Sequence, residues 1–385
     1  MNATDNAPLL SETVGKVLKQ SAIPAALTIN ECAKIVAMSA TSFRRKLAQE
    51  ETSFKLIQQK YLNELCVRAL LTKQDKIDKL AISLGYSERA TFERAFRQKF
   101  GLTPHQFREL SIQHSALGYQ KDLIAAAKNL TPMPKSCKQL LKEKEQDSLD
   151  LEVITNIVNQ DPVLSARVIG QASKAVYGKT PSGVKEAISR NLGINTVINL
   201  AVVYALNDAM AEKVDPLVLM RYTAAFVFAP KLFQKVRQST QHHAFLQNTL
   251  DEQVLAFGLF GVLLLTQEDT SIHQLVRHSV QGIDDISSLN NHLRKSLKVS
   301  LFASSSLLLS LWHIDAQVIK QLHHLDQVCQ GKAKATTHDD ILLLIFNCLY
   351  RYATGHTAVE DLVEKAELLN IEGFEEITAE IQFAE

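Results

Sequence analysis

The sequence predicts an all-α protein with more than one domain. Straight-chain helix formers dominate the 385 residues, and glycine, which weakens helices, occupies only 14 positions. Hydrophobic residues make up 46% of the chain, and they recur at helical spacing along most of it. A chain of this length has room for two or three domains, each burying its own core.

The sequence carries none of the signals that direct a chain to a membrane. The longest apolar run, Val254–Leu265, has 12 residues, too few to span a bilayer. The first residues lack the basic-then-apolar order of a signal peptide. The cysteines fit neither a disulfide framework nor a CxxC metal site, because they are odd in number and widely spaced: Cys32, Cys66, Cys137, Cys329 and Cys348. We expect a cytoplasmic, soluble protein without a cofactor or membrane contact.

The net charge of +1 is unevenly distributed. Residues 28–110 carry 15 Lys and Arg against 9 Asp and Glu, a balance of +6. Residues 111–385 carry 25 against 30, a balance of −5. A basic module joined to an acidic one is typical of DNA binding by the first and protein contacts by the second.

The first basic segment, Thr28–Leu47, has the pattern of a helix-turn-helix. Thr28 with Glu31 forms a capping-box pattern at the start of its first helix. After a break, Ser39 can cap the second helix, whose first turns would reach base edges with Thr41, Arg44 and Arg45.

A second unit of the same kind follows a long predicted helix over Phe54–Leu71. Gly85 takes the tight turn and Ser87 caps the next helix, which Gly101 ends before Pro104 begins a closing helix. The packed stripe before the turn is Ile77, Leu80, Ala81 and Leu84, and the buried face after it is Phe92, Ala95, Phe96 and Phe100. The long helix between the units can hold two recognition helices apart, so that one chain reads two adjacent half-sites.

The two units together resemble the AraC-family DNA-binding domain over about 80 residues. The stretch ATFERAFRQKFGLTPHQFR stands where that family has an aromatic-rich recognition helix, then glycine, proline and a closing aromatic–arginine pair. Ala37 departs from the family, in which glycine is common at that turn. The resemblance implies base contacts from Thr41, Ser42, Arg44 and Arg45 in the first unit and from Glu88, Arg89, Thr91 and Arg94 in the second, with Arg97 and Lys99 on phosphate.

A different pattern begins near residue 130. Pro132 and Pro134 mark a domain entry, since proline disfavours helix in the residue before it. Asp161 followed by Pro162 caps and starts another helix. The part from 118 to 385 resembles an HDOD domain, a helical relative of the HD and HD-GYP phosphohydrolases. The matching landmarks are Leu130–Pro134, Asp161-Pro162, Ala166-Arg167, Ala172-Ser173, Tyr177-Gly178, Leu192-Gly193, Leu311–Ile314 and His323-His324.

The resemblance also locates where a hydrolytic HD domain would hold its divalent metal. The histidine–aspartate pair should follow a glycine and two apolar residues, yet this chain has Gly258–Val262, which reads GLFGV. The upstream position for a histidine reads Arg221–Thr223. Apolar side chains do not coordinate a hard metal ion, so we expect no metal site and no catalytic residues. The GxxG spacing within Gly258–Gly261 is instead typical of tight helix packing.

His323 and His324 form the one remaining candidate constellation. Neighbouring helical residues point about 100° apart, so both cannot easily hold one metal ion without other ligands. One interpretation is a remnant ligand or a pH-sensitive contact. The other is one packed and one exposed histidine.

The expected organisation is a tail over 1–27, an AraC-like DNA-binding domain over 28–112 with two helix-turn-helix units, and an HDOD-like domain over 118–385. It predicts a bacterial, sequence-specific transcription regulator of double-stranded DNA. Its HDOD-like part would act without catalysis, through a protein partner, a ligand or self-association. The alternatives are a metal-dependent phosphohydrolase of the HD superfamily and a signalling scaffold with a vestigial helix-turn-helix.

Overall fold

The computed structural model confirms an all-α chain. It describes residues 9–50, 52–71, 76–115, 133–144, 148–174, 179–212, 214–240, 250–265, 283–297, 300–312, 314–356 and 358–382. Within these ranges every regular element is a helix, and an isolated bridge joins Thr240 to Ile371. The chain divides into two compact units, Met1–Ile112 and Gln113–Glu385, described separately below.

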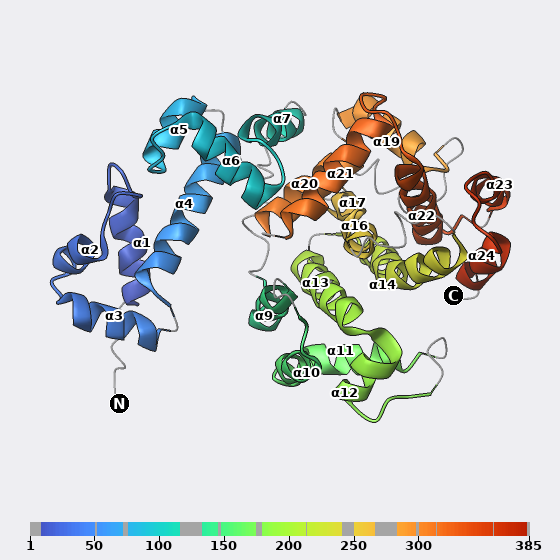
Figure 1. The fold of residues 1–385 in the computed structure, drawn as a ribbon, viewed down its shortest axis with the longest axis horizontal. Helices are drawn as coiled ribbons and strands as arrows, with labels where there is room; N and C mark the ends of the chain where they lie inside the picture. The colour runs from blue at the N-terminus through green and yellow to red at the C-terminus, as the bar shows by residue number, and fades with distance from the viewer. Residues whose placement is uncertain are drawn as a thin grey trace. The chain divides into compact units, whose positions relative to one another are not determined.

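The first unit holds two helix-turn-helix pairs on either side of one long helix (Figure 1, blue to teal). The long helix is α4 (Phe54–Leu71). The other elements are α1 (Leu10–Gln20), α2 (Ile29–Ile35), α3 (Ala40–Gln49), α5 (Ile77–Ser83), α6 (Arg89–Phe100) and α7 (Pro104–Ser115).

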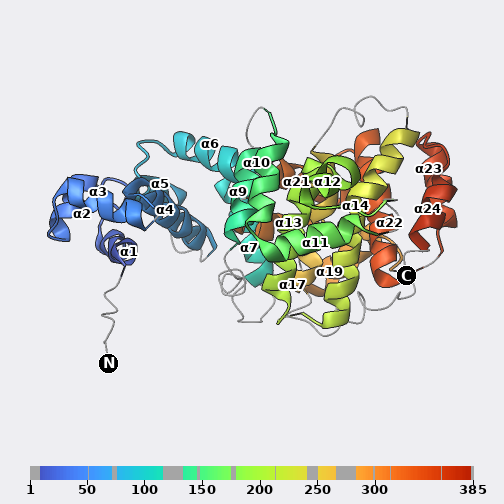
Figure 2. The ribbon, with the colours of Figure 1, turned by 90° about the horizontal axis from the view of Figure 1, so that it is seen from below.

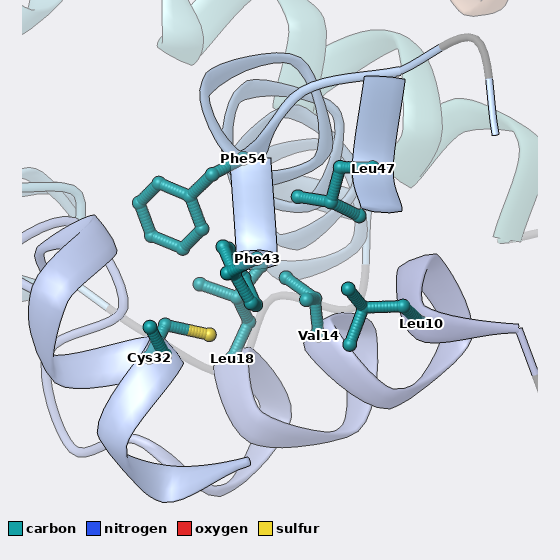
Figure 3. Packing of buried hydrophobic residues seen from close by; sticks show 8 residues of the cluster. Leu10, Val14, Leu18, Cys32, Phe43, Leu47 and Phe54 are labelled. Carbon is teal, nitrogen blue, oxygen red and sulfur yellow. The ribbon is translucent and has the colours of Figure 1, made fainter. Parts of the chain in front are cut away.

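Helix α1 lies in the segment that the sequence analysis treated as a tail. Three of its apolar residues, Leu10, Val14 and Leu18, fall on one face because they are four residues apart, and all three are buried. Figure 3 shows them meeting Cys32, Phe43, Leu47 and Phe54 in one cluster. The prediction of a tail over 1–27 is therefore wrong for Leu10–Gln20, which completes the core beneath the first helix-turn-helix.

Glu50 fixes the beginning of α1 from forty residues away. The residue before α1, Leu9, offers no side-chain cap. The Glu50 carboxylate instead accepts hydrogen bonds from the backbone N–H groups of Leu10 (2.8 Å) and Ser11 (2.9 Å). Burial alone would raise the pKa of Glu50, but these hydrogen bonds outweigh burial and lower it. An anion at a helix N-terminus is also favoured by the helix dipole.

Aromatic rings form the core of the second helix-turn-helix. Phe96 lies at the centre, with its ring centroid 4.4 Å from that of Phe100, 5.6 Å from that of Phe107 and 5.8 Å from that of Phe92. Tyr86, in the turn, extends the row to Phe92 at 5.5 Å. The predicted buried face of α6 is confirmed at its three phenylalanines, whereas Ala95 is only partly buried.

The second unit is a helical bundle in which long helices cross one another (Figure 2, green to red). Its elements are α9 (Lys135–Lys144), α10 (Leu151–Asn159), α11 (Pro162–Ala172), α12 (Val184–Glu186), η2 (Ala187–Leu192), α13 (Ile194–Met210), α14 (Pro216–Ser239), α16 (Asp251–Phe257), α17 (Phe260–Leu265), α19 (Ile286–Leu297), α20 (Leu301–Leu311), α21 (Ala316–Cys329), α22 (Thr337–Thr354), α23 (Glu360–Leu368) and α24 (Phe374–Gln382). As predicted, Asp161 caps α11, accepting from the N–H of Leu164 at 3.0 Å.

The core of this unit lies around α14. This helix packs against α13, α16 and α22, and most of its apolar side chains are buried. By length and composition alone α14 could cross a membrane, and so could the bent pair 184–192 and 194–210. However, 56% of the apolar window of α14 is buried within the unit, and core helices pass the same test.

The turn of each helix-turn-helix pair contains a residue with left-handed backbone. Gly85 has φ +84°, and a Cβ there would lie 2.8 Å from the Cβ of Ala25. Ala37, at the matching turn of the first pair, has φ +54° although it carries a side chain. A left-handed non-glycine residue costs roughly 1–2 kcal/mol. The first turn therefore stores strain that a glycine would remove.

We predict that Ala37→Gly stabilises the protein by roughly 0.5–1 kcal/mol, because the strain relieved exceeds the entropy that glycine adds to the unfolded chain. Urea denaturation of the full chain measures the change. The matched variant Gly85→Ala should destabilise, since it combines a positive φ with a close contact. Loss of stability in Ala37→Gly would contradict the assignment of strain to this turn.

Candidate nucleic-acid interface

Helix α3 presents the predicted contact residues of the first unit. Ser39 caps it as predicted, its Oγ accepting from the N–H of Ser42 at 3.2 Å. Ser42 is partly buried by this cap, while Thr41, Arg44 and Arg45 are exposed. The arginines therefore stand on the outer face of a helix whose start is fixed.

Burial of the inner face of α3 fixes the orientation of its outer face. Phe43 and Leu47 are buried in one cluster with Cys32 and Ala33 of α2, in which Figure 3 shows Leu47 on the side of Leu10 and Val14, away from Cys32. Ala33 is 1% exposed, so a small residue lets the two helices approach closely. Ala81 in α5, in the first helix of the second pair, is also 1% exposed. Each pair thus has a small buried residue in its first helix.

Helix α6 begins one residue later than the sequence analysis expected. Its N-cap is Glu88, with extended backbone (φ −136°, ψ 141°) and no side-chain cap, so the prediction of Ser87 as N-cap is wrong. The end of the helix follows the prediction, because Gly101 adopts φ +70° and its N–H bonds to Arg97 O at 2.9 Å.

The exposed residues of α6 differ in whether their side chains form ion pairs. Thr91, Arg94 and Arg97 are exposed, as is Glu88 before the helix. Arg89 is held by neighbouring carboxylates: its Nε lies 2.6 Å from Glu93 Oε1, and its Nη1 lies 3.8 Å from Asp78 Oδ1. A contact from Arg89 to a phosphate or base would first have to break these pairs.

Lys99 is partly buried and turned toward the inner side of α6. Burial lowers the pKa of its ammonium, and its Nζ lies 5.8 Å from the centroid of the Phe100 ring. It lines a cavity together with residues of α4. Arg97, three residues from Arg94 on the exposed side, has no such burial.

The first unit matches known helix-turn-helix proteins. Residues 32–110 match the family model described as a helix-turn-helix domain, which confirms the AraC-type resemblance. The HTH-type transcriptional regulator VqsM of Pseudomonas aeruginosa is 36% identical over 76 residues, which cover 20% of this chain and 23% of that protein. The match thus spans less than a quarter of the relative. A DNA-binding transcriptional dual regulator from Escherichia coli K-12 aligns at 26% identity over 29% of this chain and 99% of that structure, with a TM-score of 0.26.

The second unit contains an HDOD domain. Residues 130–327 match the HDOD family model, which is more than half of the chain, and the chain therefore belongs to the HDOD family. A provisionally assigned signal transduction protein from Marinobacter aquaeolei VT8 shares the fold at a TM-score of 0.50 and 20% identity. That alignment covers 72% of this chain and 63% of that structure.

The place expected for the histidine–aspartate pair is filled by closely packed backbone. Gly258 lies between α16 and α17, and a Cβ added to it would overlap the ring of Phe346. A Cβ on Gly261 would lie 2.7 Å from the backbone N of Ser305 and would also overlap the carbonyl of Leu301. Ser305 Oγ accepts from the N–H of Gly261 at 2.7 Å and donates to the carbonyl of Gly258. This confirms the predicted tight helix packing at the GxxG.

Aromatic rings occupy the neighbouring positions on α14. Tyr222, within the stretch where an upstream histidine was sought, is fully buried, with its ring centroid 6.1 Å from that of Phe226. Phe226 meets Phe260 edge-on at 4.5 Å. In the part of the chain that the structure describes, no group of three or more His, Cys, Asp or Glu side chains is arranged to hold a metal ion.

In the histidine pair on α21, the ring of His323 has a buried Nδ1, and the side chain of His324 is 40% exposed. His324 Nε2 lies 3.1 Å from Asp339 Oδ2, and the same carboxylate oxygen accepts from the N–H of Thr336 at 2.9 Å in the capping box of α22. His324 thus contacts a helix cap. The landmarks Leu130–Pro132, Tyr177-Gly178 and His313 lie outside the described residues.

A second histidine–carboxylate contact joins α22 to α16. His338 Nε2 lies 3.1 Å from Oδ1 of the fully buried Asp251. The hydrogen bond to Asp251 raises the pKa of His338, while burial raises the pKa of Asp251. The partners are 87 residues apart, so no local pattern could have joined them.

We predict that Gly261→Ala destabilises the second unit by at least about 1–3 kcal/mol, because its Cβ would meet backbone atoms that cannot rotate away. Differential scanning calorimetry of the full chain measures the effect. The control is Gly170→Ala, inside α11, where a Cβ meets nothing within 4 Å. It should stabilise by roughly 0.5–1 kcal/mol. Equal effects from both variants would refute close packing at Gly261.

Proposed function

We propose that this protein is a sequence-specific transcription regulator that binds double-stranded DNA through its first unit. The observation that carries the proposal is the pair of recognition helices, α3 and α6, each with its apolar face buried and its arginines outside. The similarity to the HTH-type transcriptional regulator VqsM agrees with this function.

We order the proposed contacts by the exposure of each side chain and by whether it is already held by another residue. Arg44, Arg45 and Arg94 are exposed and serve as the main base or phosphate contacts, with Thr41 and Thr91 beside them. Ser42 contributes mainly to the cap of α3. Arg97 contacts phosphate. Glu88, Arg89 and Lys99 contribute less to affinity, since the first is acidic, the second is ion-paired and the third is partly buried.

The second unit acts, in our proposal, as a non-catalytic signalling module that binds a protein partner or a second copy of the chain in the cytoplasm. The close packing at Gly258 and Gly261 supports this role, because side chains of the size of metal ligands do not fit there. The alternative of a working HD phosphohydrolase needs such ligands at that place.

Genome-wide mapping of occupied DNA, followed by binding of the purified chain to the recovered duplexes, tests the function. Specific duplexes should bind more tightly than random duplex at about 0.15 M salt, and affinity should fall steeply with salt, as expected for several phosphate contacts. Equal affinity for both duplexes would instead favour a signalling scaffold that no longer reads DNA.

We predict that Arg94→Ala weakens specific binding by about 1–3 kcal/mol, the range for an arginine that reads a base. The matched variant on the same helix is Arg89→Ala, which should cost less, because Arg89 is already paired with Glu93 and Asp78. Fluorescence anisotropy at fixed salt measures both. A larger loss for Arg89→Ala would overturn the proposed order.

We predict that the purified protein carries no stoichiometric transition metal, because no set of ligands is assembled among the described residues of the second unit. Elemental analysis of protein purified without chelators checks this. Bound iron or manganese near one ion per chain, together with phosphodiester hydrolysis, would establish the enzyme instead.

A further inference from the structure

The first unit contains a cavity of about 310 Å³ whose lining shares only Lys99 with the proposed DNA contacts. It lies between α4 and α6, beside the turn that follows α5. Its size is at the lower end of small-molecule sites, which measure about 300–1,000 Å³. All the residues that line it belong to the first unit.

The floor of the cavity is apolar and aromatic. Its buried lining residues are Cys66, Leu84, Phe92, Phe96 and Phe100. The partly buried Leu62 and Ala95 extend this surface. Such a surface accepts an aliphatic chain or a single ring, and it does not favour a fully polar ligand.

Two lysines supply positive charge at the same cavity. Lys99 is partly buried and Lys55 is exposed, and both line it. Among the described residues, no carboxylate forms an ion pair with either lysine. Burial lowers the pKa of the Lys99 ammonium, and the Cys66 thiol, whose own pKa burial raises to about 12, acts on it electrostatically.

The Phe100 ring, 5.8 Å from Lys99 Nζ, replaces only part of the hydration that this partly buried ammonium loses, since no carboxylate pairs with it. A ligand carboxylate would supply the missing counter-charge through a charge-assisted hydrogen bond. The apolar floor would at the same time bury the rest of that ligand. The positive charge and the apolar floor therefore both favour a carboxylate with an apolar body.

We propose that this cavity is a binding site for a small amphipathic carboxylate, with its apolar body on the phenylalanine floor and its carboxylate at Lys99 and Lys55. Such a ligand would contact α4 through Leu62 and Cys66 and α6 through Phe96 and Lys99.

The cavity lies on the side of α6 away from Arg94, so a ligand in it can affect DNA binding without occupying the surface that would contact bases. At 100° per residue, Phe96 and Lys99 lie on the side of α6 opposite Arg94. The helix on the other side of the cavity is α4, which connects the two helix-turn-helix pairs. A bound carboxylate would brace α6 against that connector.

The test uses octanoate as the probe and octanamide as its uncharged match, each titrated into the full chain by isothermal calorimetry. Octanoate should bind saturably, and octanamide at least about tenfold more weakly, because it lacks the charge that pairs with Lys99. This comparison needs no DNA, so it is independent of the proposed function. No saturable octanoate binding, or equal affinity for both probes, would overturn the proposal.

Three variants locate the binding. Lys99→Met should weaken octanoate binding at least about tenfold, and Lys99→Arg should restore it. Ala95→Leu, which fills the cavity and keeps both lysines, should also weaken it. Lys34→Met, at an exposed position on α2, is the matched control and should bind octanoate as the unmodified chain does. Unchanged affinity in both Lys99→Met and Ala95→Leu would place the octanoate elsewhere and refute the site.

Discussion

Burial of one face of each recognition helix is the constraint on which the rest of the first unit depends. Phe43 in α3 and Phe96 in α6 are almost fully buried, and each is surrounded by rings or aliphatic side chains. Once such a ring is fixed, helical geometry decides which residues face outward. Arg44 and Arg94, two positions or fewer from those rings, are thereby held at the surface without any contact of their own. The core thus orients side chains that it does not touch.

Much of the fold could be predicted from local sequence, because the signals that start and stop helices are local. The capping box of Thr28 with Glu31, the cap at Ser39 and the left-handed Gly101 all lie where the sequence places them. Helix α1 was missed because its cap is not local: the carboxylate comes from Glu50. Its apolar residues do recur at helical spacing, but the partners that bury them belong to the helix-turn-helix and lie outside the segment.

The candidate interface was predictable from local spacing only to the level of helix faces and one ion pair. Exposure of Arg44, Arg45 and Arg94 follows from spacing. The Arg89–Glu93 pair could also have been found, since the residues are four apart on one helix. The turn of Lys99 toward α4 could not, because it depends on a cavity that two helices form only after they pack. The cavity residues come from positions up to 45 apart, from Lys55 to Phe100.

At Gly258 and Gly261 of the second unit, the packing itself excludes metal ligands, which is a stronger statement than that the ligands are missing from the sequence. A missing histidine or aspartate suggests that one substitution could restore it. At Gly258 and Gly261, however, even a Cβ collides with neighbouring atoms, and Ser305 bridges the break between α16 and α17 from inside the core. An imidazole at Gly261 would have to displace the backbone of α20, and a carboxylate at Val262 would lose its hydration, since Val262 is 1% exposed. The packing that stabilises this bundle and the space that a metal centre needs are therefore in direct competition at this place.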